Sequence, residues 1–120
     1  PEIGERIVAT VPGFAAVAKA IRHEQERYDG AGYPDGLSGD EIPLASRIVL
    51  VCDAFHAMIT DRPYRKSIGM AEARNELSMH AGTQFDPDVV GALLRVIDEH
   101  GVPESVGQAS FTGTTNAAVA

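Results

Sequence analysis

The sequence predicts an all-α fold, a helical bundle of about five helices in one small domain. Apolar residues recur at intervals of three and four along five separate stretches, which is the spacing of one helix face. Proline and glycine interrupt the pattern between these stretches, where helices are expected to end. A chain of 120 residues can form a core, and folding should bury about two thirds of the surface that the unfolded chain exposes.

The first two helices are predicted at roughly 2–10 and 13–28, on either side of a Pro-Gly pair. In the second helix an apolar stripe runs as far as Ile21. Continuing that stripe by three, four and seven residues reaches Glu24, Gln25 and Tyr28. Polar groups that face a core cost free energy unless they are paired or bind something. We therefore expect a site near the end of this helix.

The third predicted helix, roughly 43–60, is apolar nearly all round, which predicts the central and most buried helix. Asp40 is its predicted N-cap, and Pro43 suits the first helical turn. Cys52, the only cysteine, is interpreted as a small buried apolar residue. A single cysteine excludes an internal disulfide and fits a reducing compartment.

A few polar residues interrupt this apolar helix. Asp53 and His56 share a face with Thr60, at positions i, i+3 and i+7. A carboxylate in apolar surroundings is costly if it is unpaired. Asp53 is therefore either half of a buried ion pair, for instance with Arg47 or Arg62, or a metal ligand, and both interpretations stay open.

The basic segment "DRPYRK", residues 61–66, follows the third helix. The arginine fork suits bidentate recognition of phosphate or guanine, although cations at this place also complement the helix dipole. The net charge of −7 argues against binding to a nucleic-acid polymer or to an anionic membrane. No apolar run is long enough to span a membrane. A single small anionic ligand is compatible with this charge pattern.

Two more helices are predicted at roughly 70–80 and 87–99. Asp86 is the expected N-cap of the last one, with Phe85 and Val90 as a hydrophobic staple. Beyond residue 103 the composition shifts to Ser, Thr, Gly, Ala and Gln. We therefore expect one domain over 1–103 and a disordered tail over 104–120.

The stretch "RYDGAGYPDG", residues 27–36, separates the second and third helices. One interpretation is a connector, whose glycines supply positive φ angles and whose proline supplies a turn. The other is a binding loop, because Tyr33 is a large aromatic residue that can stack on a base. The glycine spacing is not that of a P-loop.

Several motifs occur together in the order and approximate spacing of one family. They are the Gly32-Tyr33-Pro34 triplet, "GLSGDEIP", "DAF", "DRPYRK" and "GTQFDP". Over nearly all of residues 1–100 the chain resembles the C-terminal half of an HD-GYP domain. The resemblance implies an all-helical, partial HD-type domain related to enzymes that hydrolyse the bacterial messenger cyclic di-GMP. Those enzymes use two or three metal ions, often iron or manganese, to activate a water molecule.

The resemblance also implies roles for individual residues. Asp53 matches a carboxylate metal ligand on the helix after the GYP loop. The positions expected to bind the dinucleotide are Tyr33, Arg62 and Arg65. The loop framework around them is matched by Asp29, Gly30, Gly32 and Pro34. No residue is assigned as catalytic with this evidence.

The chain departs from the family at its metal ligands. Two adjacent metal-binding histidines usually precede Glu-Arg-aromatic-Asp-Gly, and here those places hold Glu24 and Gln25. Glu24 remains a candidate metal ligand, whereas Gln25 is a poor one. His23 stands one position too early, and His56 replaces a second acid after "DAF". The family's His-Asp pair belongs to a region upstream of these motifs.

We therefore expect a degenerate or partial HD-GYP signalling module that binds cyclic di-GMP, or a partner such as a GGDEF-type domain, without hydrolysing nucleotide by itself. One alternative is an active metal-dependent phosphodiesterase, completed by preceding sequence or another subunit. Another is a structural fragment that forms a homo-oligomer. The resemblance and the lone cysteine imply a bacterial, cytoplasmic setting.

Overall fold

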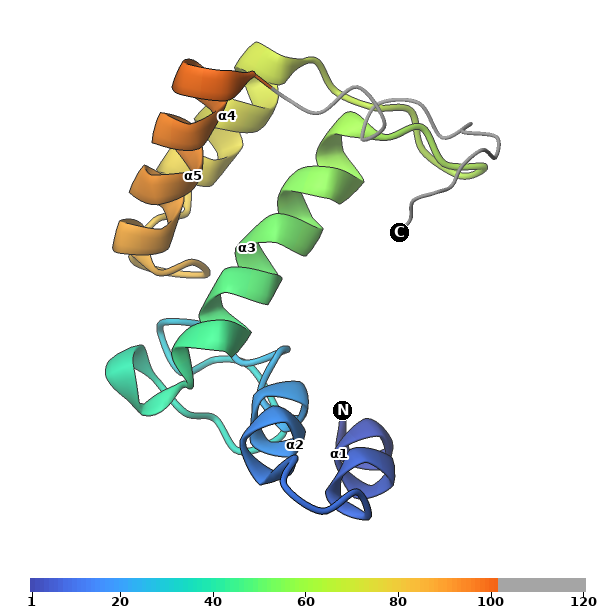
Figure 1. Ribbon diagram of the computed structural model, residues 1–120. Helices are drawn as coiled ribbons and strands as arrows, with labels where there is room; N and C mark the ends of the chain where they lie inside the picture. The colour runs from blue at the N-terminus through green and yellow to red at the C-terminus, as the bar shows by residue number, and fades with distance from the viewer. Residues whose placement is uncertain (102–120) are drawn as a thin grey trace.

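A computed structural model describes residues 1–101; the tail predicted at 104–120 lies outside them. The described chain forms five α-helices and no strand, which confirms the all-α prediction. The helices are α1 (Glu2–Ala9), α2 (Ala15–Arg22), α3 (Leu44–Ile59), α4 (Met70–Met79) and α5 (Pro87–His100), with a short 3-10 helix η1 (Gly39–Glu41) before α3. In Figure 1, α1 and α2 lie near the N-terminal end of α3, and α4 and α5 lie side by side along it.

The core lies where α3, α4 and α5 meet. Its buried members are Val51, Phe55, Ala73, Leu77, Phe85, Val89 and Val90. The apolar spacing of the last two predicted helices therefore marked most of their inward faces, although Met79, in the same pattern, is exposed. Burying one such side chain stabilises the fold by about 1.5–3 kcal/mol, so these residues dominate the packing energy.

The central helix α3 is less buried than its composition predicts. Val51 and Phe55 enter the core, but Leu44, Ile48 and Val49 are exposed. The physical reason is that α4 and α5 cover only part of its circumference, and α2 contacts it without enclosing it. None of the described helices has the length and apolarity needed to cross a membrane.

Two further expectations about this helix are wrong. Cys52 is exposed and lines a groove of about 510 Å³ between α3 and α5, because it faces away from the core. Asp40 does not cap α3, since it lies inside η1 and Pro43 occupies the N-cap position instead. By contrast, Asp86 caps α5 as predicted, accepting a hydrogen bond from the Asp88 N–H at 2.8 Å.

Two polar contacts fix α3 against its neighbours. The buried Ser46 hydroxyl donates to the Ala20 carbonyl at the end of α2, at 2.6 Å. The Arg47 guanidinium donates to the Asp86 carboxylate at the start of α5, also at 2.6 Å. Burial alone would raise the pKa of Asp86, but hydrogen bonds from Arg47 and from the following backbone amides lower it below its usual value.

The predicted second helix extends too far, because α2 ends at Arg22 rather than near residue 28. The backbone turns at His23, and the Glu26 N–H then donates to the His23 carbonyl at 3.1 Å. This turn directs the His23 and Glu26 side chains into the interior, where both are buried. The chain then continues as the glycine loop.

Candidate functional site

A buried carboxylate organises the glycine loop between α2 and α3. The Glu26 side chain is completely buried, and its two oxygens accept hydrogen bonds from the backbone N–H groups of Asp35, at 2.9 Å, and Leu37, at 3.0 Å. The Nδ1 atom of His23 lies 3.0 Å from the same carboxylate. Because buried polar groups require partners, these contacts fix the loop relative to the end of α2.

Gly32 makes the closest backbone approach in this loop. A Cβ atom there would lie 2.7 Å from the Glu26 Cα and closer still to backbone atoms of Gln25 and Arg27, so only glycine fits. The next residue, Tyr33, donates its N–H to the Gln25 carbonyl at 3.4 Å. Its side chain is 57% exposed. The loop therefore holds an aromatic ring at the surface on a closely packed backbone.

Two arginine–aspartate pairs hold the loop in place, one from α2 and one within the loop itself. Arg22 donates two hydrogen bonds to Asp35, at 2.9 and 3.0 Å, and Arg27 donates two to Asp29, at 3.1 and 2.9 Å. The hydrogen bonds from these guanidinium groups lower the pKa of both carboxyl groups. Both aspartates therefore stay ionised. The Arg22–Asp35 pair ties the loop to the end of α2, and the Arg27–Asp29 pair connects two residues of the loop.

The second candidate segment, residues 61–67, follows α3. The backbones of Arg62 and Arg65 exchange two hydrogen bonds, at 2.8 and 3.1 Å, which close a tight turn. The Asp61 carboxylate accepts the Ser67 N–H at 2.8 Å, and this bond lowers the pKa of Asp61. Arg62 Nε is buried but has no hydrogen-bond partner among the described residues. Leaving such a donor unpaired costs about 1–3 kcal/mol, so its position calls for an explanation.

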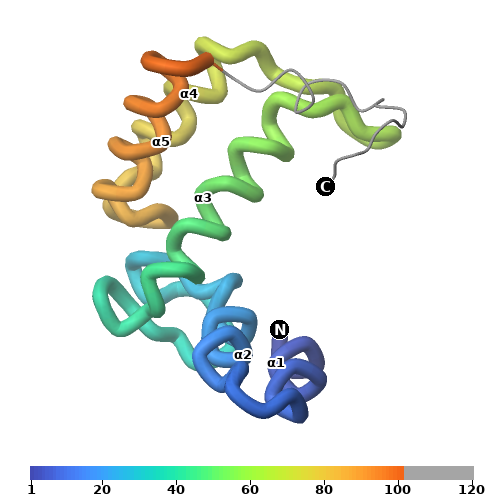
Figure 2. The backbone as a smooth tube through the Cα atoms, viewed as in Figure 1, coloured from blue at the N-terminus to red at the C-terminus, as the bar shows by residue number. Residues whose placement is uncertain are grey.

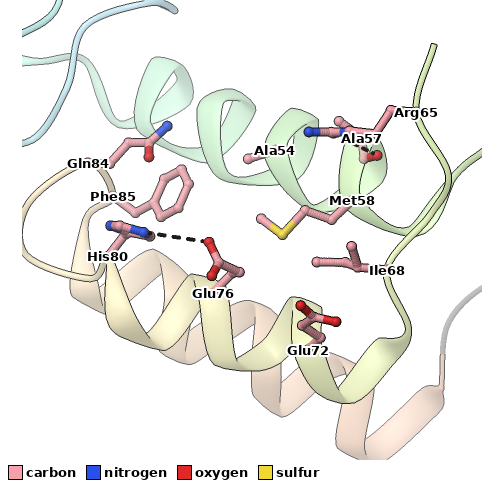
Figure 3. A pocket seen from close by; sticks show the side chains of 10 residues that line it. All are labelled: Ala54, Ala57, Met58, Arg65, Ile68, Glu72, Glu76, His80, Gln84 and Phe85. Atoms are coloured by element: carbon pink, nitrogen blue, oxygen red, sulfur yellow. Dashed lines mark hydrogen bonds and ion pairs between the residues drawn. The ribbon is translucent and has the colours of Figure 1, made fainter. Parts of the chain in front are cut away.

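Arg65 borders a cavity of about 420 Å³ between α3 and α4 (Figure 3). Its guanidinium donates to the Ala57 carbonyl at 3.3 Å. On the opposite wall, α4 presents Glu72 and Glu76, and Glu76 lies 3.6 Å from His80 Nε2. The cavity beside the basic turn therefore offers both positive and negative groups.

Asp53 lies near the middle of α3 and is exposed. The buried ion pair considered for it is wrong, because Arg47 pairs with Asp86 and no ion pair reaches Asp53 within the described chain. His56, on the same face, is exposed too. An exposed carboxylate on an uncovered helix face stays available to a ligand, so the metal role of Asp53 stays a prediction.

The residues at the metal positions that the resemblance implies do not by themselves fit a centre of two or three metals. Among residues 1–101, one group of three potential ligands has donor atoms within 4.8 Å of one another, and it consists of His23, Glu26 and Asp35. Neither Asp53 nor Glu24 belongs to it. In the described chain, the predicted metal positions therefore form no assembled multidentate site.

The two candidate segments lie at opposite ends of α3. Figure 2 shows the cyan loop near its N-terminal end and the yellow-green turn beyond its C-terminal end. The helix has 16 residues and so spans about 24 Å at 1.5 Å per residue. The resemblance implies that Tyr33 and the arginines of "DRPYRK" bind one dinucleotide, whereas the fold separates them by the length of α3. A ligand that touches both must extend along this helix.

Sequence reasoning missed the buried polar pair beneath the loop. It placed Glu24, Gln25 and Tyr28 on the inward face, but the structure leaves these half-buried and buries His23 and Glu26. The helical stripe failed as a guide because the helix ends before it reaches them. The available signal was a histidine three residues before a glutamate, next to a glycine loop whose amides need acceptors.

Comparison with known proteins identifies the family. A family model described as an HD domain matches residues 1–89, which is most of the chain. The chain belongs to the HD domain family.

Several curated relatives show what similar chains do. The cyclic di-GMP phosphodiesterase response regulator RpfG of Xanthomonas campestris is 53% identical over 76 residues, covering 63% of this chain and 20% of its own length. A cyclic di-GMP phosphodiesterase of Thermotoga maritima is 42% identical over 80 residues, covering 67% and 22%. The 3'3'-cGAMP-specific phosphodiesterase 3 of Vibrio cholerae is 33% identical over 94 residues, covering 78% and 20%.

One solved structure shares the fold. The crystal structure of a cyclic GMP-AMP specific phosphodiesterase of V. cholerae superimposes with a TM-score of 0.72 at 24% identity, over 90% of this chain and 26% of that chain. The chain therefore spans about a fifth of the length of its curated relatives and about a quarter of this structural neighbour.

Proposed function

We propose that this chain is part of an HD-GYP module that binds a cyclic dinucleotide, cyclic di-GMP, without hydrolysing it through its own residues alone. The proposal goes beyond membership of the HD domain family. It is supported by relatives whose names specify cyclic di-GMP or 3'3'-cGAMP as substrate. It also draws on the Gly32-Tyr33-Pro34 triplet and the basic turn.

The observation that carries the proposal is the buried, unpartnered Nε of Arg62. A phosphate or guanine oxygen is the acceptor that a guanidinium recognises best. Arg65 lies across the same turn and adds a second cation. An anionic ligand at this turn would pair the orphan donor, and Tyr33 would stack on a base at the far end of α3.

The donor set argues against hydrolysis by this chain alone. Glu24 and Gln25 occupy the places of the two histidines that the resemblance implies. Gln25 is neutral and a poor ligand for a transition metal, and Asp53 belongs to no group of three potential metal ligands among the described residues. Binding without hydrolysis is what these residues support.

Isothermal titration calorimetry with cyclic di-GMP on the full chain tests this function. We expect saturable binding that weakens at least about tenfold, or 1.4 kcal/mol, in both Tyr33→Ala and Arg62→Met. Arg95→Met is the matched control, because Arg95 is an exposed arginine on α5, away from both segments. Absence of binding, or equal weakening by the control, would overturn the proposal.

An active phosphodiesterase is the second candidate, and the short coverage of the relatives favours it. The aligned region is only about a fifth of proteins named as phosphodiesterases, so further metal ligands can come from elsewhere. Hydrolysis of cyclic di-GMP by a longer natural protein, abolished by Asp53→Ala, would establish it. A longer protein that binds but never hydrolyses the dinucleotide would exclude it.

A protein partner or a homo-oligomer is the third candidate, favoured by apolar residues on α1, α2 and the link between them. Those more than 40% exposed there are Ile3, Ile7, Val11, Phe14 and Val17. Exposed apolar groups in this density are typical of interaction surfaces, such as one for a GGDEF-type domain or a second copy. Light scattering that shows a concentration-independent monomer would remove the oligomer. A cytoplasmic setting belongs to the same proposal, on the resemblance and the lone cysteine.

A further inference from the structure

We propose that His23, Glu26 and Asp35 form a divalent metal site that clamps the glycine loop to the end of α2. Their donor atoms all lie within 4.8 Å of one another. His23 Nδ1 lies 3.0 Å from Glu26 Oε2 and 3.7 Å from Asp35 Oδ2. Ligand atoms around one ion about 2.0–2.2 Å away stand at separations of this size. The site involves neither Asp53 nor Glu24 and does not depend on nucleotide binding.

Burial and charge both favour a cation at this place. The Glu26 side chain is completely buried and that of His23 is 6% exposed. Among the described residues, His23 Nδ1 is the side-chain contact of Glu26, and no lysine or arginine contacts this carboxylate. Burying an uncompensated carboxylate is expensive, and buried charges are normally paired or bound to a metal. A divalent ion held by these three donors would bring a positive charge to the buried carboxylate.

The surroundings resemble the outer shell of a metal site. Asp35, which would be a ligand, accepts two hydrogen bonds from Arg22, and Glu26 accepts the backbone N–H groups of Asp35 and Leu37. Such second-shell donors orient ligating carboxylates. Asp35 is 39% exposed, which provides an entry path and leaves room for water in the remaining coordination position.

The ligand chemistry indicates which ions to test. One imidazole nitrogen with two carboxylate oxygens suits Zn²⁺ and the neighbouring first-row divalent ions, whereas Mg²⁺ prefers oxygen alone. Three protein ligands plus water is the coordination of an open zinc site. We therefore expect Zn²⁺ to bind more tightly than Mn²⁺, and Mg²⁺ to bind weakest.

Equilibrium dialysis of the untagged full chain, first stripped with chelator, against ZnCl₂ tests the proposal without nucleotide. We expect one ion per chain, and a loss of affinity of about a hundredfold or more in His23→Gln and in Asp35→Asn. Two matched controls should bind as wild type: His80→Gln, a histidine that also lies beside a glutamate, and Asp98→Asn, an exposed carboxylate on α5. Circular dichroism verifies that each variant is folded.

Cobalt spectroscopy supplies a second readout if either variant folds poorly. Co²⁺ bound to the wild type should show visible d–d bands of a nitrogen- and oxygen-ligated site, displaced by Zn²⁺. The proposal is overturned if the wild type binds no ion, if binding survives His23→Gln, or if binding is lost in Asp98→Asn. These metal-binding experiments contain no cyclic di-GMP, so their result does not depend on whether the dinucleotide binds to the protein.

Discussion

The glycine loop and the basic turn, at the two ends of α3, satisfy their polar groups very differently. In the loop, a buried carboxylate accepts two backbone amides, and the exposed carboxylate of Asp35 is held by two guanidinium hydrogen bonds. In the turn, backbone hydrogen bonds close the chain, yet Arg62 Nε stays buried without an acceptor within the described residues. The carboxylate oxygens of the loop all accept hydrogen bonds as folded, whereas the turn leaves a donor unused.

This difference indicates which region contributes to folding stability and which to ligand binding. A loop whose buried groups are all paired loses stability when any of them is removed. A turn with an unpaired donor gains nothing from that donor until a ligand supplies an acceptor. Substitutions of the buried Glu26 and the closely packed Gly32 should therefore destabilise the protein, whereas those at Arg62 should spare the fold and reduce binding.

The largest expected effect is that of Glu26→Ala. It leaves the buried amides of Asp35 and Leu37 without acceptors, which should lower the free energy of unfolding by about 4 kcal/mol. Urea denaturation with chelator present measures this change. Glu24→Ala, in the same turn, is the control and should change stability by less than about 0.5 kcal/mol. A loss below about 1 kcal/mol for Glu26→Ala would contradict the role of the loop carboxylate.

Gly32→Ala should follow, at about 3 kcal/mol, because the new methyl group would overlap the backbone of residues 25–27. The same denaturation experiment measures it. Gly69→Ala serves as the control, because a Cβ there meets nothing within 4 Å and its φ of −50° suits any residue. Equal stability of the two variants would show that the loop can move away from the end of α2.

Arg47→Ala should lower the free energy of unfolding by about 2 kcal/mol, because it removes the partner of the buried Asp86. The loss should be smaller than for a fully buried pair, because Arg47 itself is partly exposed. Thermal unfolding at neutral pH measures the loss. Arg74→Ala is the control, since its ion pair with Asp98 is exposed and should contribute little. The Arg47–Asp86 pair joins α3 to the start of α5.

The pH dependence of the same pair has a definite sign. The pKa of Asp86 is lower in the folded protein than in the unfolded chain, so its contribution is fully present above the unfolded value of about 3.9. It should disappear as the pH falls through the lower folded-state pKa. Wild-type stability should therefore drop more steeply below about pH 4 than that of Arg47→Ala. Parallel curves would show that Arg47 does not hold Asp86 ionised.

The smallest expected effect on stability is that of Arg62→Met, at less than about 0.5 kcal/mol. The variant removes a buried donor that has no partner, so no hydrogen bond is lost in the described residues. Chemical denaturation compares it with wild type. A loss of more than about 2 kcal/mol would mean that Arg62 stabilises the fold, and the contrast between the two ends of α3 would fail.

Helix positions were predictable because local patterns determine them. The Asp86 cap, the proline after it and the apolar spacing of α5 all act within a few residues. Burial around α3 was not predictable. The exposure of Cys52 and Asp53 depends on which helices cover which face of α3, and composition cannot specify that. At the end of α2, where inward-facing polar groups were expected, two buried polar side chains do occur.

The residues predicted to face inward at the end of α2, Glu24, Gln25 and Tyr28, are nevertheless not the buried ones. His23 and Glu26 are interior because the helix ends early and the loop folds back on its own amides. Arg62 was singled out from its residue type, but its unpaired Nε could only be found in three dimensions. Long-range backbone contacts, rather than periodicity, decide these features.

The side-chain NMR signal of Arg62 Nε–H tests the central claim most directly. In ¹⁵N-labelled protein titrated with cyclic di-GMP, the account predicts a saturable downfield shift of this resonance as the buried donor acquires an acceptor, while the Arg95 signal stays in place. An Arg62 signal that does not move at saturating ligand, or no ligand binding at all, would contradict the account.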